Sequence, residues 1–151
     1  MYDFNPDSGR LFAKRADGLT FDLDLRKPLT IIQGDSATGK TLLCNLIEED
    51  NVSQDEPAVQ VLNYKDRGRR NRLDIIYDTT VKLFIIDNAD VLLIDNTELL
   101  DYINRIDHLN QFLVFSRCIK FRRTPNYFGT LEMDGSNVIR IKYVTNVAGW
   151  F

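Results

Sequence analysis

Apolar and polar residues alternate strictly from Phe21 to Leu25, a pattern that is typical of a strand with one buried face. An Asp-Gly pair at 17–18 separates this segment from another apolar segment before it, and Asp-Gly between such segments favours a tight hairpin turn. A second Asp-Gly pair, at 134–135, also lies between two strand-like segments. The pattern therefore predicts antiparallel hairpins over residues 9–26 and 128–145.

The middle of the chain has a different pattern, in which short apolar runs alternate with segments of helical periodicity. Four runs read as buried strands: Leu29–Gln33, Ala58–Leu62, Val81–Ile86 and Gln111–Ser116. Two segments place their apolar residues on one helical face: Lys40–Glu49 and Asn96–Ile106. Because strands that alternate with helices favour a parallel sheet covered by helices, the expected fold class is α/β, with a core over residues 29–117.

The segment Gly34–Thr41 (GDSATGKT) matches the phosphate-binding pattern G-x-x-x-x-G-K-[ST] in full. It follows a predicted strand and opens a predicted helix, which is the context that the motif requires. Glycines allow the backbone to approach a phosphate closely, and the loop amides and the helix N-terminus then donate to it. The residues expected to contact the nucleotide are Gly34, Asp35, Ser36, Ala37, Thr38, Gly39, Lys40, Thr41 and Leu42.

A magnesium ion needs oxygen ligands beside these phosphates. The hydroxyl of Thr41 is one candidate, as the last residue of the motif. Asp87 is the other, because it ends the apolar run Leu83–Ile86, where an uncompensated carboxylate would be costly. The expected ligands of the site are therefore a nucleotide and Mg²⁺, with Lys40 on the phosphates and with Thr41 and Asp87 on the metal.

The segment Ile85–Leu92 (IIDNADVL) resembles the Walker B region of AAA+ ATPases, and Gln111–Arg117 (QFLVFSR) resembles their sensor strand. A further strand between the two motif strands resembles the division of P-loop NTPases that holds the AAA+, RecA-type and ABC/SMC ATPases. This resemblance implies a three-layer P-loop NTPase fold with a mainly parallel central sheet and antiparallel hairpins at both termini. It also implies ATP rather than GTP as the nucleotide and Ser116 as a sensor of the γ-phosphate.

Asn88 departs from these families, which carry a catalytic glutamate after the Walker B aspartate. An amide can orient water but cannot accept its proton, so we expect slow hydrolysis unless Asp90 or another carboxylate substitutes. The candidate catalytic residues are Lys40, Asp87, Asn88 and Ser116. Three functions remain open: an ATPase or ATP-dependent switch, a non-hydrolysing nucleotide-binding module that recognises a partner, and a small-molecule kinase.

The composition adds limits to this interpretation. The chain has 151 residues, which suits a single domain, and its net charge of −3 names no partner. Two cysteines cannot form a disulfide framework, and the N-terminus has no apolar segment typical of a signal peptide. No apolar run approaches the length of a membrane span. We therefore expect a cytoplasmic protein without membrane contact.

Nine of the 19 basic residues crowd into two short segments, 65–72 and 117–123. Such runs are usually solvated, but they could contact a nucleic-acid backbone or supply an arginine to a neighbouring nucleotide site. The chain has no room for the helical subdomains of AAA+ or ABC proteins. This favours a partner, either another protein or a second copy of the chain.

Overall fold

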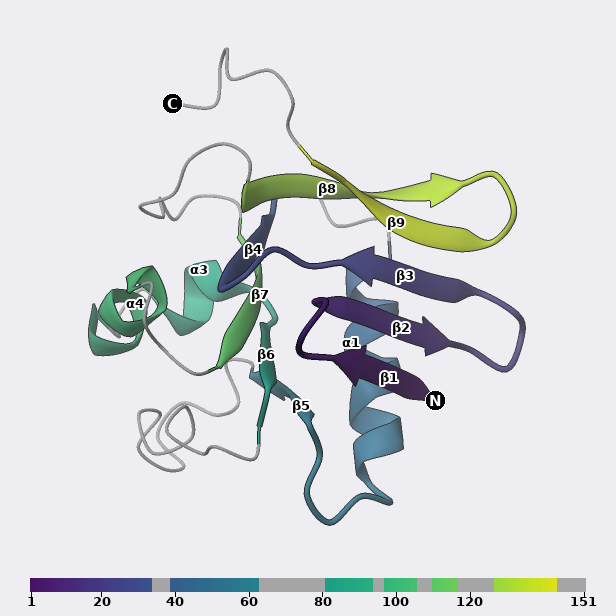
Figure 1. The fold of residues 1–151 in the computed structure, drawn as a ribbon, viewed down its shortest axis with the longest axis horizontal. Coiled ribbons are helices and arrows are strands. Elements are labelled where there is room, and N and C mark those ends of the chain that lie inside the picture. The colour runs from purple at the N-terminus through teal and green to yellow at the C-terminus, as the bar shows by residue number, and fades with distance from the viewer. Residues whose placement is uncertain (34–38, 63–80, 94–96, 106–109, 117–126, 144–151) are drawn as a thin grey trace.

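The structure of the protein, a computed structural model, describes residues 1–33, 39–62, 81–93, 97–105, 110–116 and 127–143. Nine strands in this part of the chain form one sheet, in the order β1-β2-β3-β9-β8-β4-β7-β6-β5 (Figure 1). The strands are β1 Tyr2–Asn5, β2 Arg10–Lys14, β3 Thr20–Asp24, β4 Leu29–Ile32, β5 Val59–Leu62, β6 Leu83–Ile86, β7 Gln111–Phe115, β8 Phe128–Asp134 and β9 Val138–Tyr143. The helices are α1 Lys40–Asn51, α3 Ala89–Leu92 and α4 Thr97–Asn104.

The sheet is mixed. Strands β4, β7, β6 and β5 run parallel to one another, whereas β1–β2, β2–β3 and β8–β9 are antiparallel pairs. Two further parallel pairings complete the sheet. Thr20 of β3 lies opposite Val138 of β9, which joins the antiparallel pairs to one another, and Ile31 of β4 lies opposite Phe128 of β8, which joins them to the parallel strands. Figure 1 shows that the antiparallel pairs and the parallel strands run in clearly different directions, so the sheet bends sharply where they meet.

The expected fold class, a three-layer P-loop NTPase fold with a mainly parallel central sheet, is therefore wrong. The described residues form one continuous, mostly β structure, a mixed sheet that curls into a nearly closed, barrel-like shape with only short helices. The terminal hairpins do not stand apart from a parallel core, because β8 pairs with β4 and β9 pairs with β3. These pairings join segments far apart in the sequence, and no local pattern of apolar residues specifies them.

Helix α1 spans the gap between the two edge strands, β1 and β5. The hydroxyl of Tyr2 in β1 donates a hydrogen bond of 2.6 Å to Oδ1 of Asn51, the last residue of α1. The side-chain amide of Asn51 donates one of 2.8 Å to the carbonyl oxygen of Val59 in β5. One asparagine thus ties both edges of the curled sheet to the end of the helix.

Apolar residues cover both faces of the parallel strands. Ile85 of β6 and Leu113 of β7 belong to a cluster that includes the buried side of α1 and residues of β1–β3. Phe84 and Phe112, their sequence neighbours, belong to a second cluster with residues of α3 and α4. These strands therefore bury both faces, which explains why they are continuously apolar rather than alternating. None of the helices in the described ranges is long and apolar enough to cross a membrane.

Replacing Asn51 with alanine is expected to lower the free energy of unfolding by about 1–3 kcal/mol, because the Tyr2 hydroxyl and the Val59 carbonyl both lose their partner. Urea denaturation followed by circular dichroism measures this. Val52→Ala is the matched control, since Val52 is the next residue and is 88% exposed. A loss in the Asn51 variant no larger than that of the control would show that the edge contacts do not stabilise the fold.

A network of charges holds the outer face of β2, β3 and β9 together. Arg10 donates to both carboxylate oxygens of Asp22, over 2.8 Å from Nε and 3.2 Å from Nη2. Arg140 of β9 donates to Oδ2 of the same carboxylate over 3.0 Å. The hydrogen bond from Arg10 is the main reason that the pKa of Asp22 lies below its usual value. Asp22 thereby connects three strands.

This lowered pKa predicts an acid-sensitive contribution to stability. The folded state favours ionised Asp22, so the stabilisation is complete above the unfolded pKa of about 3.9 and is lost as the pH falls through the lower, folded value. We expect the difference in free energy of unfolding between the wild type and Asp22→Asn to be constant above about pH 5 and to shrink below about pH 4. Urea titrations at pH values above about 5 and below about 4 measure this difference, and a difference that does not depend on pH would contradict the prediction.

Candidate functional site

The carboxyl ends of the parallel strands bring the predicted site residues to one edge of the sheet. The backbone N–H of Ser116, which follows β7, donates to the carbonyl of Ile32 at the end of β4 over 3.1 Å. The N–H of Asp87, which follows β6, donates to the carbonyl of Leu62 at the end of β5 over 2.9 Å. These hydrogen bonds fix where the two side chains leave the sheet.

Gly39 caps the start of α1 at this edge. Its φ of 84° lies in the left-handed region that favours glycine. A Cβ atom at this position would lie 2.8 Å from Cδ1 of Ile139 and 3.2 Å from Cε1 of Phe21, so β3 and β9 pack closely against the residue. The left-handed conformation thus favours glycine at this position, and a larger residue would also require the side chains of Ile139 and Phe21 to shift. The rest of the predicted loop, residues 34–38, lies outside the described part of the chain.

Lys40 and Asp87, 47 positions apart in the sequence, meet at this edge. Nζ of Lys40, the first residue of α1, lies 3.6 Å from Oδ1 of Asp87. The two side chains are 19% and 31% exposed, so the pair is partly shielded but open to a ligand. The structure therefore joins the cation expected on the phosphates with the carboxylate expected on the metal.

The chemistry of Thr41 and Asp87 fits a magnesium ion. Magnesium prefers oxygen ligands, keeps several waters and is often held by one or two protein oxygens together with the phosphates of a substrate. Thr41 is exposed next to Lys40 at the N-terminus of α1, and its hydroxyl and the Asp87 carboxylate are oxygen donors. No group of three or more His, Cys, Asp and Glu side chains gathers within the described ranges.

Ser116 and Asp90 form a contact at the same edge. The hydroxyl of Ser116 donates a hydrogen bond of 3.0 Å to Oδ1 of Asp90, which lies in the first turn of α3. Ser116 is 4% exposed, and its hydroxyl already donates to Asp90. A γ-phosphate could accept a hydrogen bond from this hydroxyl only if the hydrogen bond to Asp90 broke. The sequence predicted Asp90 as a possible substitute for the missing catalytic glutamate. It did not predict the hydrogen bond between Asp90 and Ser116, because no motif relates the end of β7 to the start of α3.

Asn88 occupies the position at which the resembling families have a glutamate. It is exposed and has a left-handed backbone conformation, with φ of 54° and ψ of 65°, immediately before α3. Asparagine tolerates this conformation better than most residues with a side chain. Asn88 therefore has a structural task, which is to turn the chain from β6 into α3.

Cys44 lies one helical turn after Lys40 and is buried. Burial raises the pKa of its thiol well above the usual value, and the negative charge of Asp87 adds to this effect. A thiol that stays protonated is a poor nucleophile. This supports the packing role that its place on the apolar face of the helix suggests.

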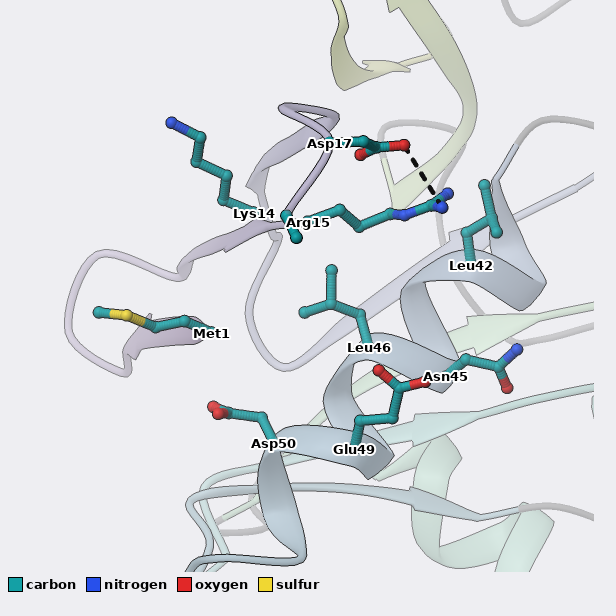
Figure 2. A pocket seen from close by; sticks show the side chains of 10 residues that line it. Met1, Lys14, Arg15, Asp17, Leu42, Asn45, Leu46, Glu49 and Asp50 are labelled. Carbon is teal, nitrogen blue, oxygen red and sulfur yellow. Dashed lines mark ion pairs between the residues drawn. The ribbon is translucent and has the colours of Figure 1, made fainter.

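An open cavity of about 660 Å³ lies between α1 and the turn that joins β2 to β3. Figure 2 shows Leu42 and Leu46 of α1 on one side and Arg15, which pairs with Asp17 over 3.4 Å, on the other. Leu42 follows Lys40 by two residues, which is about 200° around the helix, so the cavity and the Lys40 side chain lie on different sides of α1.

The two basic segments, 65–72 and 117–123, lie outside the described residues. Comparisons of the chain with protein-family models, with curated proteins and with solved structures found no match. A functional assignment therefore depends on the geometry of the site itself.

Proposed function

We propose that the protein binds Mg·ATP at the edge of the sheet where α1 begins. The observation that carries this proposal is the 3.6 Å contact between Lys40 and Asp87, because a phosphate-binding motif and a metal-binding carboxylate gain a function together only when they meet. The left-handed Gly39 supports it, since that conformation directs the chain from the motif into the helix. The proposed place of action is the cytoplasm.

In this proposal each residue has one task. Lys40 and the amides at the start of α1 bind the phosphates, while Thr41 and Asp87 bind the metal. Magnesium neutralises phosphate charge and makes the γ-phosphorus more open to attack by water. Asn88 can orient that water but cannot take its proton, so hydrolysis by the chain alone is slow. Slow hydrolysis is consistent with a molecular switch, a protein that binds different partners according to the nucleotide it holds.

Two measurements test the proposal. Titration with a fluorescent ATP analogue, with Mg²⁺ and with EDTA, should show binding that requires Mg²⁺ and that weakens in Asp87→Ala. Single-turnover release of phosphate then separates an ATPase from a non-hydrolysing module, since only the former releases phosphate in a reaction that Asp87→Ala abolishes. Binding that is unchanged in Asp87→Ala would refute the proposed site.

A further inference from the structure

The ion pair between Lys40 and Asp87 has a consequence for the ligand that the site accepts. Lys40 lies in the first turn of α1, and Asp87 directly follows β6, where its N–H donates to the carbonyl oxygen of Leu62. The charged atoms lie 3.6 Å apart in a partly shielded position. In this arrangement Asp87 partly compensates the positive charge of Lys40 before any phosphate arrives.

A free triphosphate meets two obstacles at such a pair. To contact Lys40 it must compete with Asp87, and once bound it leaves the carboxylate beside a polyanion with no cation between them. The repulsion between like charges a few ångströms apart is stronger in a partly shielded site than in bulk water, because the effective dielectric constant is lower. The site therefore opposes a triphosphate that comes without a cation.

A divalent cation removes both obstacles together. Bound between Asp87 and the phosphates, it replaces Lys40 as the partner of the carboxylate, and the ammonium group is released to contact the phosphates. The charges of all three groups are then compensated. The cation is thus required for the exchange of partners as well as for any later chemistry.

We propose that Asp87 makes this site selective for the complex of a divalent cation with a triphosphate, and against the free triphosphate, by neutralising Lys40 until the cation takes over the carboxylate. This proposal rests on the proposed function, because it concerns the same site. It adds that Asp87, a metal ligand when magnesium is present, is a negative determinant of binding when magnesium is absent.

The test is isothermal titration of the full chain with ATP and with tripolyphosphate, each in EDTA and in Mg²⁺. Asp87→Asn keeps the size of the side chain and loses only its charge, and Asp55→Asn removes an exposed carboxylate from the loop after α1 as a control. In EDTA we expect Asp87→Asn to bind tripolyphosphate about 10-fold more tightly than the wild type, with a smaller gain at high salt. In Mg²⁺ it should bind more weakly than the wild type, while Asp55→Asn follows the wild type in both conditions.

Asp87→Asn could strengthen binding in EDTA because it releases Lys40, or only because it removes the repulsion between Asp87 and the phosphates. A double-mutant cycle with Lys40→Gln separates these two explanations. If Asp87 acts by holding Lys40, the gain from Asp87→Asn in EDTA should fall from about 10-fold to less than about 3-fold when Lys40 is already glutamine. An equal gain in both backgrounds, or no gain in the wild-type background, overturns the proposal. Magnesium-dependent binding by the wild type would still support the proposed function in that case, whereas binding of neither ligand under any condition would refute both.

Discussion

Replacing Lys40 with alanine is expected to weaken Mg·ATP binding by about 100-fold. Charge-assisted hydrogen bonds contribute about 1.5–3 kcal/mol each, and one factor of ten in affinity corresponds to about 1.4 kcal/mol. A 100-fold loss corresponds to about 2.8 kcal/mol, which lies within the range for one charge-assisted hydrogen bond from Lys40 to a phosphate oxygen. Fluorescence titration with the ATP analogue in Mg²⁺ measures it.

Lys142→Ala is the matched control for this variant. Lys142 is an exposed residue of β9, so its loss removes the same charge from the protein without touching the proposed site. We expect the affinity of that variant to stay within about 2-fold of the wild type, since surface substitutions of this kind have small effects. An affinity in Lys40→Ala that matches the control, in a protein shown to be folded by circular dichroism, would contradict the assignment of the phosphate site.

Phe112→Ala is expected to lower the free energy of unfolding by about 3–5 kcal/mol, a large part of the total for a domain of this size. Phe112 is fully buried in β7, stacks on Phe84 of β6 with ring centroids 5.7 Å apart, and meets Tyr102 of α4 edge-on at 6.1 Å. Removal of the ring leaves a cavity between the sheet and α4. Urea denaturation measures the loss.

The effect of that variant should extend to the proposed nucleotide site. Strand β7 pairs with β4, which precedes the predicted phosphate-binding motif, and with β6, which directly precedes Asp87. Phe112→Leu is the control, because it keeps most of the apolar volume and should cost less than about 1.5 kcal/mol. A loss in Phe112→Ala no larger than that in Phe112→Leu would show that the core on the α4 side relaxes around the missing ring.

Much of the local structure follows from the sequence. The apolar runs that predict strands contain β4, β5, β6 and β7, and the helical periodicity after Lys40 corresponds to α1. These predictions succeed because burial on both faces leaves a continuous apolar signal. Strand β1 gives no such signal, since Phe4 is its one buried residue and the strand depends on pairing with β2.

The sequence predicted the individual residues of the candidate site, but it did not predict all of the contacts between them. Gly39, Lys40 and Thr41 follow from the motif, and Asp87 from its position after an apolar strand. The bond between Ser116 and Asp90 had no sequence signal, because it joins the end of one strand to the start of a helix that follows another. The backbone strain at Asn88 was equally hidden, since an asparagine in a loop can adopt many conformations.

The sequence by itself determined the elements and the charged groups of this protein: buried strands, an amphipathic helix, and the lysine and the aspartate that the motif and the strand pattern assign to a predicted nucleotide site. The tertiary structure alone decided the fold class, because the pairings β3–β9 and β4–β8 turn two hairpins and a set of parallel strands into one curled sheet. It also decided that Lys40 and Asp87 neutralise each other. The physical reason is the same in both cases: hydrogen bonds between strand edges and attraction between charges depend on distance in space, which a pattern of neighbours along the chain does not encode.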